Sequence, residues 1–387
     1  MSSPDLTAEE RRAVAAVLQT PRLSMGPEAE RFEAAVRAYV GVRHAVAVAC
    51  GTAGLHLCLR ALAIADGDLV LTTPFSFVAS ANVMLYERAV PVFADVDPET
   101  GNLDPALLAQ AAADLRQGGE AARRWLPRFG ARPEAPLKGI LVVDVFGQPA
   151  DYDRIAATAQ AHGLPIIEDS CESLGSSYKG RAAGTLGDIA AFAFYPNKQM
   201  TTGEGGVVVT DRDDWARLVR ALTNQGRAPG DSWLEHTYLG YNYRLDEMSA
   251  ALGRIQMTRL EKLLAKRERV ATWYRERLTG IPGVEPPAPC AATTRMSWFV
   301  YVVRLAKGID RDAVIRRLSK LGIPSRPYFS PIHLQAYFVE RFGYRRGDYP
   351  VAEDLGDRSL ALPFSSVMRQ GQVDRVTATL QEVLRTG

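Results

Sequence analysis

The chain of 387 residues is long enough for one large unit and one smaller unit, each with its own apolar core. Its 46 Lys and Arg nearly balance its 44 Asp and Glu, so the charge does not indicate a nucleic-acid partner. No apolar run is long enough for a membrane span, the N-terminus lacks a signal-peptide core, and the scattered cysteines and histidines predict no metal site. We therefore expect a cytoplasmic, globular protein.

Helices and apolar strands alternate through most of the chain. A short helix is predicted from Thr7 to Leu18, and a second over residues 28–39. From Ala45 onwards the sequence alternates helical segments with short strands, which are Leu69–Thr72, Val90–Phe93, 140–145, 164–167, 189–194 and 207–210. This alternation predicts an α/β fold with a mostly parallel sheet and helices on both of its faces.

The last third of the chain predicts a second unit. One long helix is expected over residues 246–278, followed by a linker rich in Pro and Gly at 280–289. A strand and two helices are then predicted, at 297–305, 310–321 and 370–384. We therefore expect a large α/β domain over residues 20–278 and a small α+β domain over residues 279–387, with the N-terminal helix (residues 1–19) packed against the small domain.

A single lysine, Lys198, follows one predicted strand and precedes a Gly-rich loop that leads into the next. Most lysines in such loops are solvated surface residues. A lysine shielded from water can instead act as a nucleophile towards a carbonyl, as Schiff-base enzymes require. The loop by itself is compatible with both interpretations.

An aspartate and a turn of small residues favour the interpretation of Lys198 as a nucleophile over that of a solvated surface lysine. Asp169 ends a short apolar strand, and in parallel sheets ligands bind at the carboxyl ends of strands. Such an aspartate could simply cap the next segment. With Lys198, however, it matches the needs of pyridoxal phosphate, whose aldehyde is held by a lysine and whose ring nitrogen pairs with an acid. The turn Gly51-Thr52-Ala53 begins a helix and suits a phosphate.

In this order, these features resemble the DegT/DnrJ/EryC1/StrS family of pyridoxal-phosphate enzymes, which are mostly nucleotide-sugar aminotransferases. The residues that carry the resemblance span nearly the whole chain, and they are 51–53, 74–82, 93–98, 146–149, 167–170, 192–206, 240–247 and 331–335. The resemblance implies a fold-type I pyridoxal-phosphate-dependent transferase, similar in fold to aspartate aminotransferase.

The family also implies roles for individual residues. Lys198 would hold pyridoxal 5′-phosphate as a Schiff base and move the proton that distinguishes transamination from other reactions of this cofactor. Asp169 would pair with the ring nitrogen, Glu172 would face the ring hydroxyl, and Phe77 would stack on the ring. An alternative for Phe77 is ordinary core packing.

The phosphate would lie against Gly51, Thr52 and Ala53. Many relatives have a serine five residues before the lysine as a further phosphate ligand, and this chain has Ala193 there. The phosphate therefore lacks one hydroxyl contact. Asn242 is expected to reach the phosphate of a partner subunit, which predicts a homodimer with shared active sites. The candidate substrate-binding residues are Tyr195, Glu204, Arg244, Tyr328 and His333.

The leading prediction is an aminotransferase that converts a nucleotide-linked keto-sugar to an amino-sugar, with glutamate or glutamine as donor. Such an enzyme would serve surface-polysaccharide or secondary-metabolite sugar biosynthesis. Alternative substrates are keto-inositols or related carbocycles. A pyridoxal-binding regulator without turnover is a further alternative, but no segment outside the catalytic fold suits DNA. A purely structural α/β protein would leave the order of aspartate, lysine and glycine-rich loop without explanation.

Overall fold

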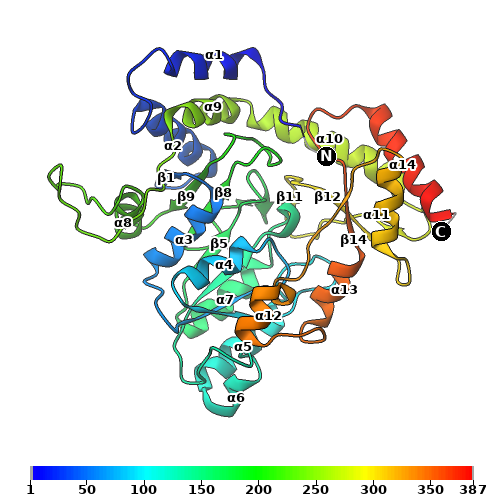
Figure 1. The fold of residues 1–387 in the computed structure, drawn as a ribbon, viewed down its shortest axis with the longest axis horizontal. Coiled ribbons are helices and arrows are strands. Elements are labelled where there is room, and N and C mark those ends of the chain that lie inside the picture. Colours follow the sequence, from blue (N-terminus) through cyan, green and yellow to red (C-terminus); the bar gives the residue numbers. More distant parts are fainter. Residues whose placement is uncertain (1–2, 386–387) are drawn as a thin grey trace.

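The computed structural model describes residues 3–385, and a seven-stranded sheet forms its centre (Figure 1). The strand order is β1-β9-β8-β5-β4-β2-β3. Four neighbouring pairs are parallel, and β9 alone runs antiparallel to its neighbours. The strands are β1 (His44–Val48), β2 (Leu69–Thr72), β3 (Val90–Phe93), β4 (Leu137–Val143), β5 (Ile166–Asp169), β8 (Ile189–Ala193) and β9 (Gly206–Thr210). The predicted mostly parallel sheet is confirmed.

Side chains alternate between the two faces of this sheet, and each face has its own helices. Leu69 and Leu71 enter one apolar cluster, while Val70 between them enters another. One face is covered by α3 (Gly51–Ala61), α4 (Ala79–Tyr86) and α8 (Asp213–Thr223). The other is covered by α2 (Pro27–Val40), α5 (Pro105–Gln117), α7 (Tyr152–His162) and α9 (Glu247–Thr258). Because both faces are buried, the strands are predominantly apolar, with Glu168 and Asp169 of β5 as buried exceptions.

A smaller antiparallel sheet with the order β10-β12-β14-β13 forms the C-terminal unit. Its strands are β10 (Val284–Glu285), β12 (Tyr301–Leu305), β13 (Arg326–Pro327) and β14 (Ser359–Leu362). Helices α11 (Arg311–Lys320) and α14 (Gln370–Arg385) share its apolar core. A third, three-stranded sheet consists of β6 (Ser177–Tyr178), β7 (Arg181–Ala182) and β11 (Thr293–Arg295).

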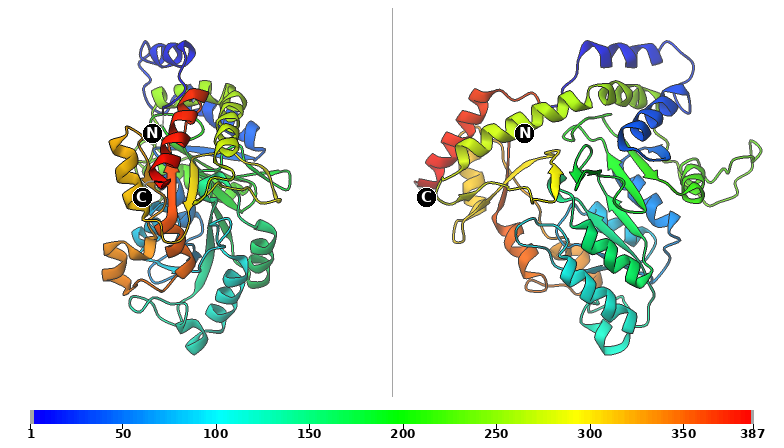
Figure 2. Two further views of the ribbon diagram at one scale, coloured as in Figure 1. Left: turned by 90° about the vertical axis from the view of Figure 1, so that its right-hand side faces the viewer. Right: turned by 180° about the vertical axis from the view of Figure 1, so that it is seen from behind.

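The long helix predicted over residues 246–278 is two helices, α9 and α10 (Leu260–Leu278), which meet at Arg259. The backbone of Arg259, at φ −109°, leaves the helical path there. The two helices follow one another along one side of the molecule, from α2 to α14 (Figures 1 and 2). The N-terminal half of α10 packs into the core of the large sheet, and its C-terminal half packs into the core of the small sheet.

The N-terminal helix does not pack where the sequence predicted. Helix α1 (Ala8–Val17) lies mainly against α9, not against the C-terminal unit. Its buried residue Glu10 accepts a hydrogen bond from Gln256 at 2.7 Å and pairs with Arg259. Buried charges of this kind need a partner, and α9 and its end supply it. This polar contact has no local sequence signal.

The proposed boundary at residues 278–279 falls at the end of α10, but the chain beyond it returns to the large sheet. The elements of this return are η2 (Ile332–Leu334), α12 (Ala336–Phe342) and α13 (Pro350–Arg358). Phe338 of α12 packs against Phe93, which ends β3. Two short elements of the large unit complete the fold, α6 (Gly119–Arg123) and η1 (Val145–Gly147). Within residues 3–385, no helix combines the length and apolar character of a membrane span.

Candidate active site

A cavity of about 450 Å³ lies at the edge of the large sheet where its parallel strands end. Val143 and Asp169 are the last residues of β4 and β5, and both line it. Gly206, the first residue of the antiparallel strand β9, pairs with the last residues of β1 and β8 at the same edge. The predicted residues that line the cavity are Gly51, Thr52, Phe77, Asp169, Glu172, Tyr195, Lys198, Glu204 and Tyr328.

The side chain of Lys198 is only 13% exposed. Its Nζ lies 3.7 Å from Oε1 of Glu172 and 3.9 Å from the centre of the Phe299 ring. A turn holds the residue, since its N–H donates to the carbonyl of Tyr195 at 2.9 Å. The amine is therefore enclosed in the cavity wall, unlike the solvated surface lysine that loop composition alone allows.

Asp169 is buried and its carboxylate is oriented by two donors. The hydroxyl of Ser80 donates to Oδ2 at 2.7 Å, and the N–H of Cys171 donates to Oδ1 at 3.2 Å. The bond to Cys171 is the local cap that is common for aspartate after a strand. Because Asp169 also lines the cavity, it can hold a positively charged group there.

Glu172 is a second buried carboxyl group, and it lies beside Lys198. Burial raises the pKa of Glu172 to about 7, although the nearby Lys198 opposes this shift. Its Oε2 accepts a hydrogen bond from the N–H of Phe146 at 2.9 Å. Near neutral pH the group therefore exchanges a proton readily, and it can serve as donor or acceptor.

The N-terminus of α3 forms a third wall of the cavity. A Cβ on Gly51 would lie 2.6 Å from Cβ of Ala193 and 3.0 Å from Sγ of Cys171, so the close approach requires glycine. The first N–H groups of a helix have no partner within it and attract anions. Here Sγ of Cys50 accepts from the N–H of Ala53 at 3.4 Å. Ala53 is itself buried behind the cavity wall.

Besides Ala53, three predicted residues do not line this cavity. Asn242 is exposed, and Nη1 of Arg244 donates to Oδ1 of Asn224 at 2.8 Å. His333 is fully buried, with Nε2 at 2.9 Å from Oε1 of Glu353. His333, in η2, therefore does not line this cavity, and its predicted contact with substrate stays a prediction.

Sequence reasoning missed several residues of the site. Ser80 orients Asp169 across 89 positions of sequence, and the ring of Phe299 lies over the amine of Lys198. Ser80 stands in the 74–82 segment that carries the family resemblance, so that segment could have indicated it. Phe299 precedes a strand of the small unit and has no local signal.

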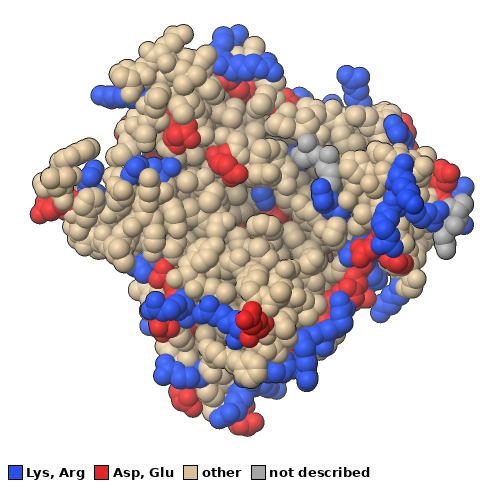
Figure 3. Space-filling model, viewed as in Figure 1, with Lys and Arg blue, Asp and Glu red and all other residues tan. Residues whose placement is uncertain are grey.

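The mouth of the cavity is aromatic. Phe77 is 61% exposed and Tyr195 is 52% exposed, and both line it. On the face shown in Figure 3, charged side chains of both signs lie mainly around the rim, while the central surface is largely uncharged. Exposed aromatic side chains at the entrance of a cavity can stack on a planar or sugar-like ligand.

Known proteins resemble this chain over its whole length. A model of the DegT/DnrJ/EryC1/StrS aminotransferase family matches residues 4–381. The chain is 37% identical to GDP-perosamine synthase of Caulobacter vibrioides, over 99% of this chain and 98% of that protein. It is 36% identical to UDP-N-acetyl-3-dehydro-alpha-D-glucosamine 3-aminotransferase of Acidithiobacillus ferrooxidans, over 95% and 92%. The PLP-form structure of the putative sugar aminotransferase Spr1654 from Streptococcus pneumoniae matches with a TM-score of 0.87 and 25% identity, over 100% and 98%.

The sheet, the cavity and these similarities define a fold-type I, pyridoxal-phosphate-dependent sugar aminotransferase. The chain belongs to the DegT/DnrJ/EryC1/StrS aminotransferase family. The donor set of the cavity fits the cofactor, since it combines an enclosed amine, a buried carboxylate and a helix N-terminus that glycine leaves open. Ala193, where many relatives have serine, packs against Gly51 and offers no hydroxyl.

Proposed function

We propose that this enzyme transfers an amino group to a keto group of a nucleotide-linked sugar, with glutamate or glutamine as donor. The observation that carries the proposal is the enclosed Lys198 amine beside Glu172 and Phe299, in one cavity with Asp169. The resemblance to enzymes named for GDP-linked and UDP-linked sugars supports a nucleotide-linked substrate. By the same resemblance, the product would enter surface-polysaccharide or secondary-metabolite sugar biosynthesis.

When bound, pyridoxal phosphate supplies a ring that stabilises negative charge on the carbon next to the transferred nitrogen. We propose that Lys198 is its attachment site and that Nζ of Lys198 afterwards carries the proton between carbon atoms. Asp169, oriented by Ser80 and Cys171, would keep the ring nitrogen protonated. Glu172 would exchange a hydrogen bond with the ring hydroxyl.

The remaining walls of the cavity would bind the cofactor and the sugar, and they would exclude water. Gly51, Thr52 and the start of α3 would hold the phosphate through backbone N–H groups. Phe77 would cover one face of the ring. At the mouth, Tyr195, Glu204 and Tyr328 would contact the sugar.

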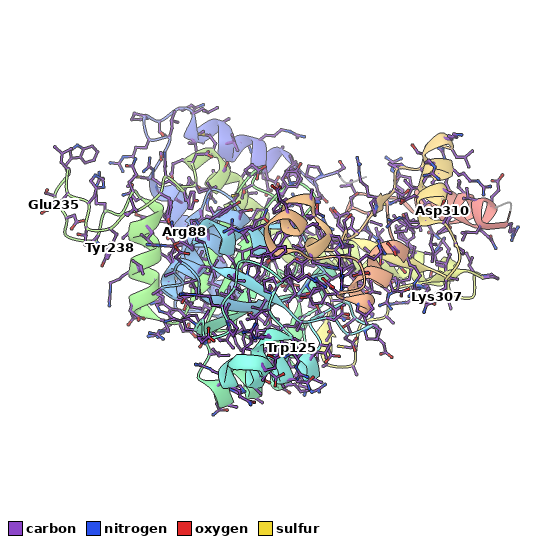
Figure 4. All side chains as sticks on the ribbon, turned by 60° about the horizontal axis from the view of Figure 1, so that its bottom comes forward. Arg88, Trp125, Glu235, Tyr238, Lys307 and Asp310 are labelled. Atoms are coloured by element: carbon purple, nitrogen blue, oxygen red, sulfur yellow. The ribbon has the colours of Figure 1, made fainter. Side chains whose placement is uncertain are left out.

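We also propose a homodimer in which Asn242 and Arg244 complete the site of the partner subunit. Both residues lie outside their own cavity. Glu235 and Tyr238 mark a loop that projects from the body of the molecule, far from Lys307 and Asp310 (Figure 4). This loop exposes three large apolar side chains by 78–84%, a feature of surfaces that become covered on association. They are Trp233, Leu234 and Leu239.

A substrate panel tests the proposed reaction. Nucleotide-linked 3-keto and 4-keto hexoses with different nucleotides are offered with glutamate or glutamine, and a keto-inositol is offered in parallel. We expect 2-oxo acid release and amino-sugar formation with one nucleotide-linked sugar, and none with Lys198→Ala. Turnover of the keto-inositol alone would overturn the proposed substrate class but not the aminotransferase chemistry.

A further inference from the structure

One buried guanidinium has no carboxylate partner. Arg267, on α10, is 2% exposed, and no salt bridge to it occurs within residues 3–385. Burial lowers the pKa of Arg267 to about 10, so the group is still a cation at neutral pH. A buried cation without a counter-ion is costly and is stabilised only by well-placed dipoles.

Those dipoles are backbone carbonyls from two separate segments. Nη1 of Arg267 donates to the carbonyls of Trp298 at 3.0 Å and Phe299 at 3.1 Å. Nη2 donates to the carbonyl of Asn197 at 3.1 Å and to that of Lys198. A planar guanidinium fixes the spacing of the two segments, which the point charge of a lysine ammonium cannot do.

The same two segments carry the amine and the ring beside it. The Nζ of Lys198 lies 3.9 Å from the centre of the Phe299 ring. The guanidinium thus binds the backbone of both residues whose side chains meet in the cavity. Arg267 does not line the cavity, so it acts on the site through these backbones.

The location of Arg267 on α10 joins the two units at this point. Leu263 and Leu264 precede it in the core of the large sheet, and Val270 and Tyr274 follow it in the core of the small sheet. Figures 1 and 2 show α10 extending from the region of the large sheet to α14. Any shift of the small unit along α10 would therefore move the carbonyls of the lysine turn.

We propose that Arg267 is a positioning residue that holds Lys198 and Phe299 together and couples the seating of the C-terminal unit to the reactive amine. The inference rests on the proposed role of Lys198. It concerns the arrangement of the amine and not the binding of substrate.

Arg267→Met tests it, because the thioether chain keeps most of the volume and removes all the donors. We expect kcat to fall about 100-fold, as for a misplacement near 1 Å, while KM for the nucleotide-linked sugar changes less than about threefold. In the cofactor-free protein, hydrogen exchange should accelerate together in segments 195–200 and 297–301.

In Arg267→Ala, added guanidinium ion should restore part of kcat, and sodium ion at equal ionic strength should not.

Arg259→Met is the matched control. Arg259 stands at the α9–α10 junction and pairs with Asp5 and Glu10, so its loss removes buried contacts without touching either segment. We expect its kcat to be unchanged. If Arg267→Met does not fold, Arg267→Lys carries the test, with an expected loss in kcat of about tenfold because the charge remains without the fork.

A wild-type kcat in the folded Arg267 variant, or unchanged exchange in the two segments, would overturn the inference. Full turnover of Lys198→Ala would instead reject the proposed role of Lys198. The exchange measurement in cofactor-free protein would then still report whether Arg267 holds the two segments. Failure of the positioning role and failure of the proposed function therefore give different results.

Discussion

Lys198 and Glu172 face one another at 3.7 Å in a wall that excludes most water. In such surroundings burial and pairing compete, and for Glu172 burial prevails, with its pKa near 7. The Lys198 amine has the Phe299 ring as a second neighbour, whose face favours a cation. Because Lys198 and Glu172 are in contact, substitution of either residue changes the surroundings of the other.

Glu172→Gln should change how stability depends on pH. The folded protein retains the Glu172 proton up to about pH 7, while the unfolded chain releases it near its ordinary value of 4.5. Wild-type protein should therefore lose stability as the pH rises across this range, and the glutamine variant should lack that loss, up to about 3 kcal/mol. Urea denaturation of cofactor-free protein between these pH values measures it. A difference between the two proteins that stays constant with pH would contradict the assignment.

Lys198→Ala should reduce turnover by at least about 10²–10⁴-fold, because the attachment site and the proton carrier are lost together. Borohydride reduction followed by peptide mapping should place the cofactor mass on the Lys198 peptide of the wild type only. Lys179→Ala is the control, since Lys179 is a surface residue paired with Asp153. Cofactor recovered on another peptide of the wild-type enzyme would refute the assignment.

At the scale of helices, α1 is attached to the α9–α10 junction by polar contacts. Glu10 closes a capping box with Thr7 and also binds Gln256 and Arg259. Burial alone would raise the pKa of Glu10. Hydrogen bonds from Thr7 and Arg259 outweigh that effect and lower the pKa to about 2. The N-terminal helix is therefore joined to the α9–α10 junction through a buried acid.

Glu10→Gln should destabilise the protein at neutral pH by about 1.5–3 kcal/mol, the usual range for hydrogen bonds to a charged group. Because the folded pKa is depressed, this contribution exists above pH 4.5 and disappears as the pH falls towards 2. The variant and the wild type should therefore converge in acid. Denaturation at several pH values measures this, with exposed Glu9→Gln as the control. A penalty that persists unchanged in acid would show that the charge is not its source.

At the scale of the whole molecule, the proposed dimer makes each site from two chains. Lys198→Ala and Asn242→Asp subunits, each impaired alone, should regain activity when refolded together. In a hybrid with shared sites, one site carries both defects and the other carries neither. Transamination assays on hybrids purified with two different tags measure the recovery. If hybrids form without any gain in activity, each chain builds its own site.

The sequence alone determined the sheet and the main reactive groups. The strands Leu69–Thr72 and Val90–Phe93 have the predicted bounds, and Asp169 and Lys198 lie in one cavity as expected. These features follow from rules that act over a few residues, such as short apolar runs, Gly-rich turns and the meeting of parallel strand ends at one edge. Gly51 was also found this way, from its place in a turn that begins a helix, although the contact with Ala193 and Cys171 that requires glycine there is tertiary.

Only the tertiary structure decided which distant residues support that site. The bonds from Arg267 to the carbonyls near Lys198, and from Ser80 to Asp169, join positions about 70–90 residues apart. The burial of His333 beside Glu353, and the packing of α1 on α9, also depend on how whole elements meet. Local propensity cannot specify such contacts, because their partners come together only when the two units pack along α10.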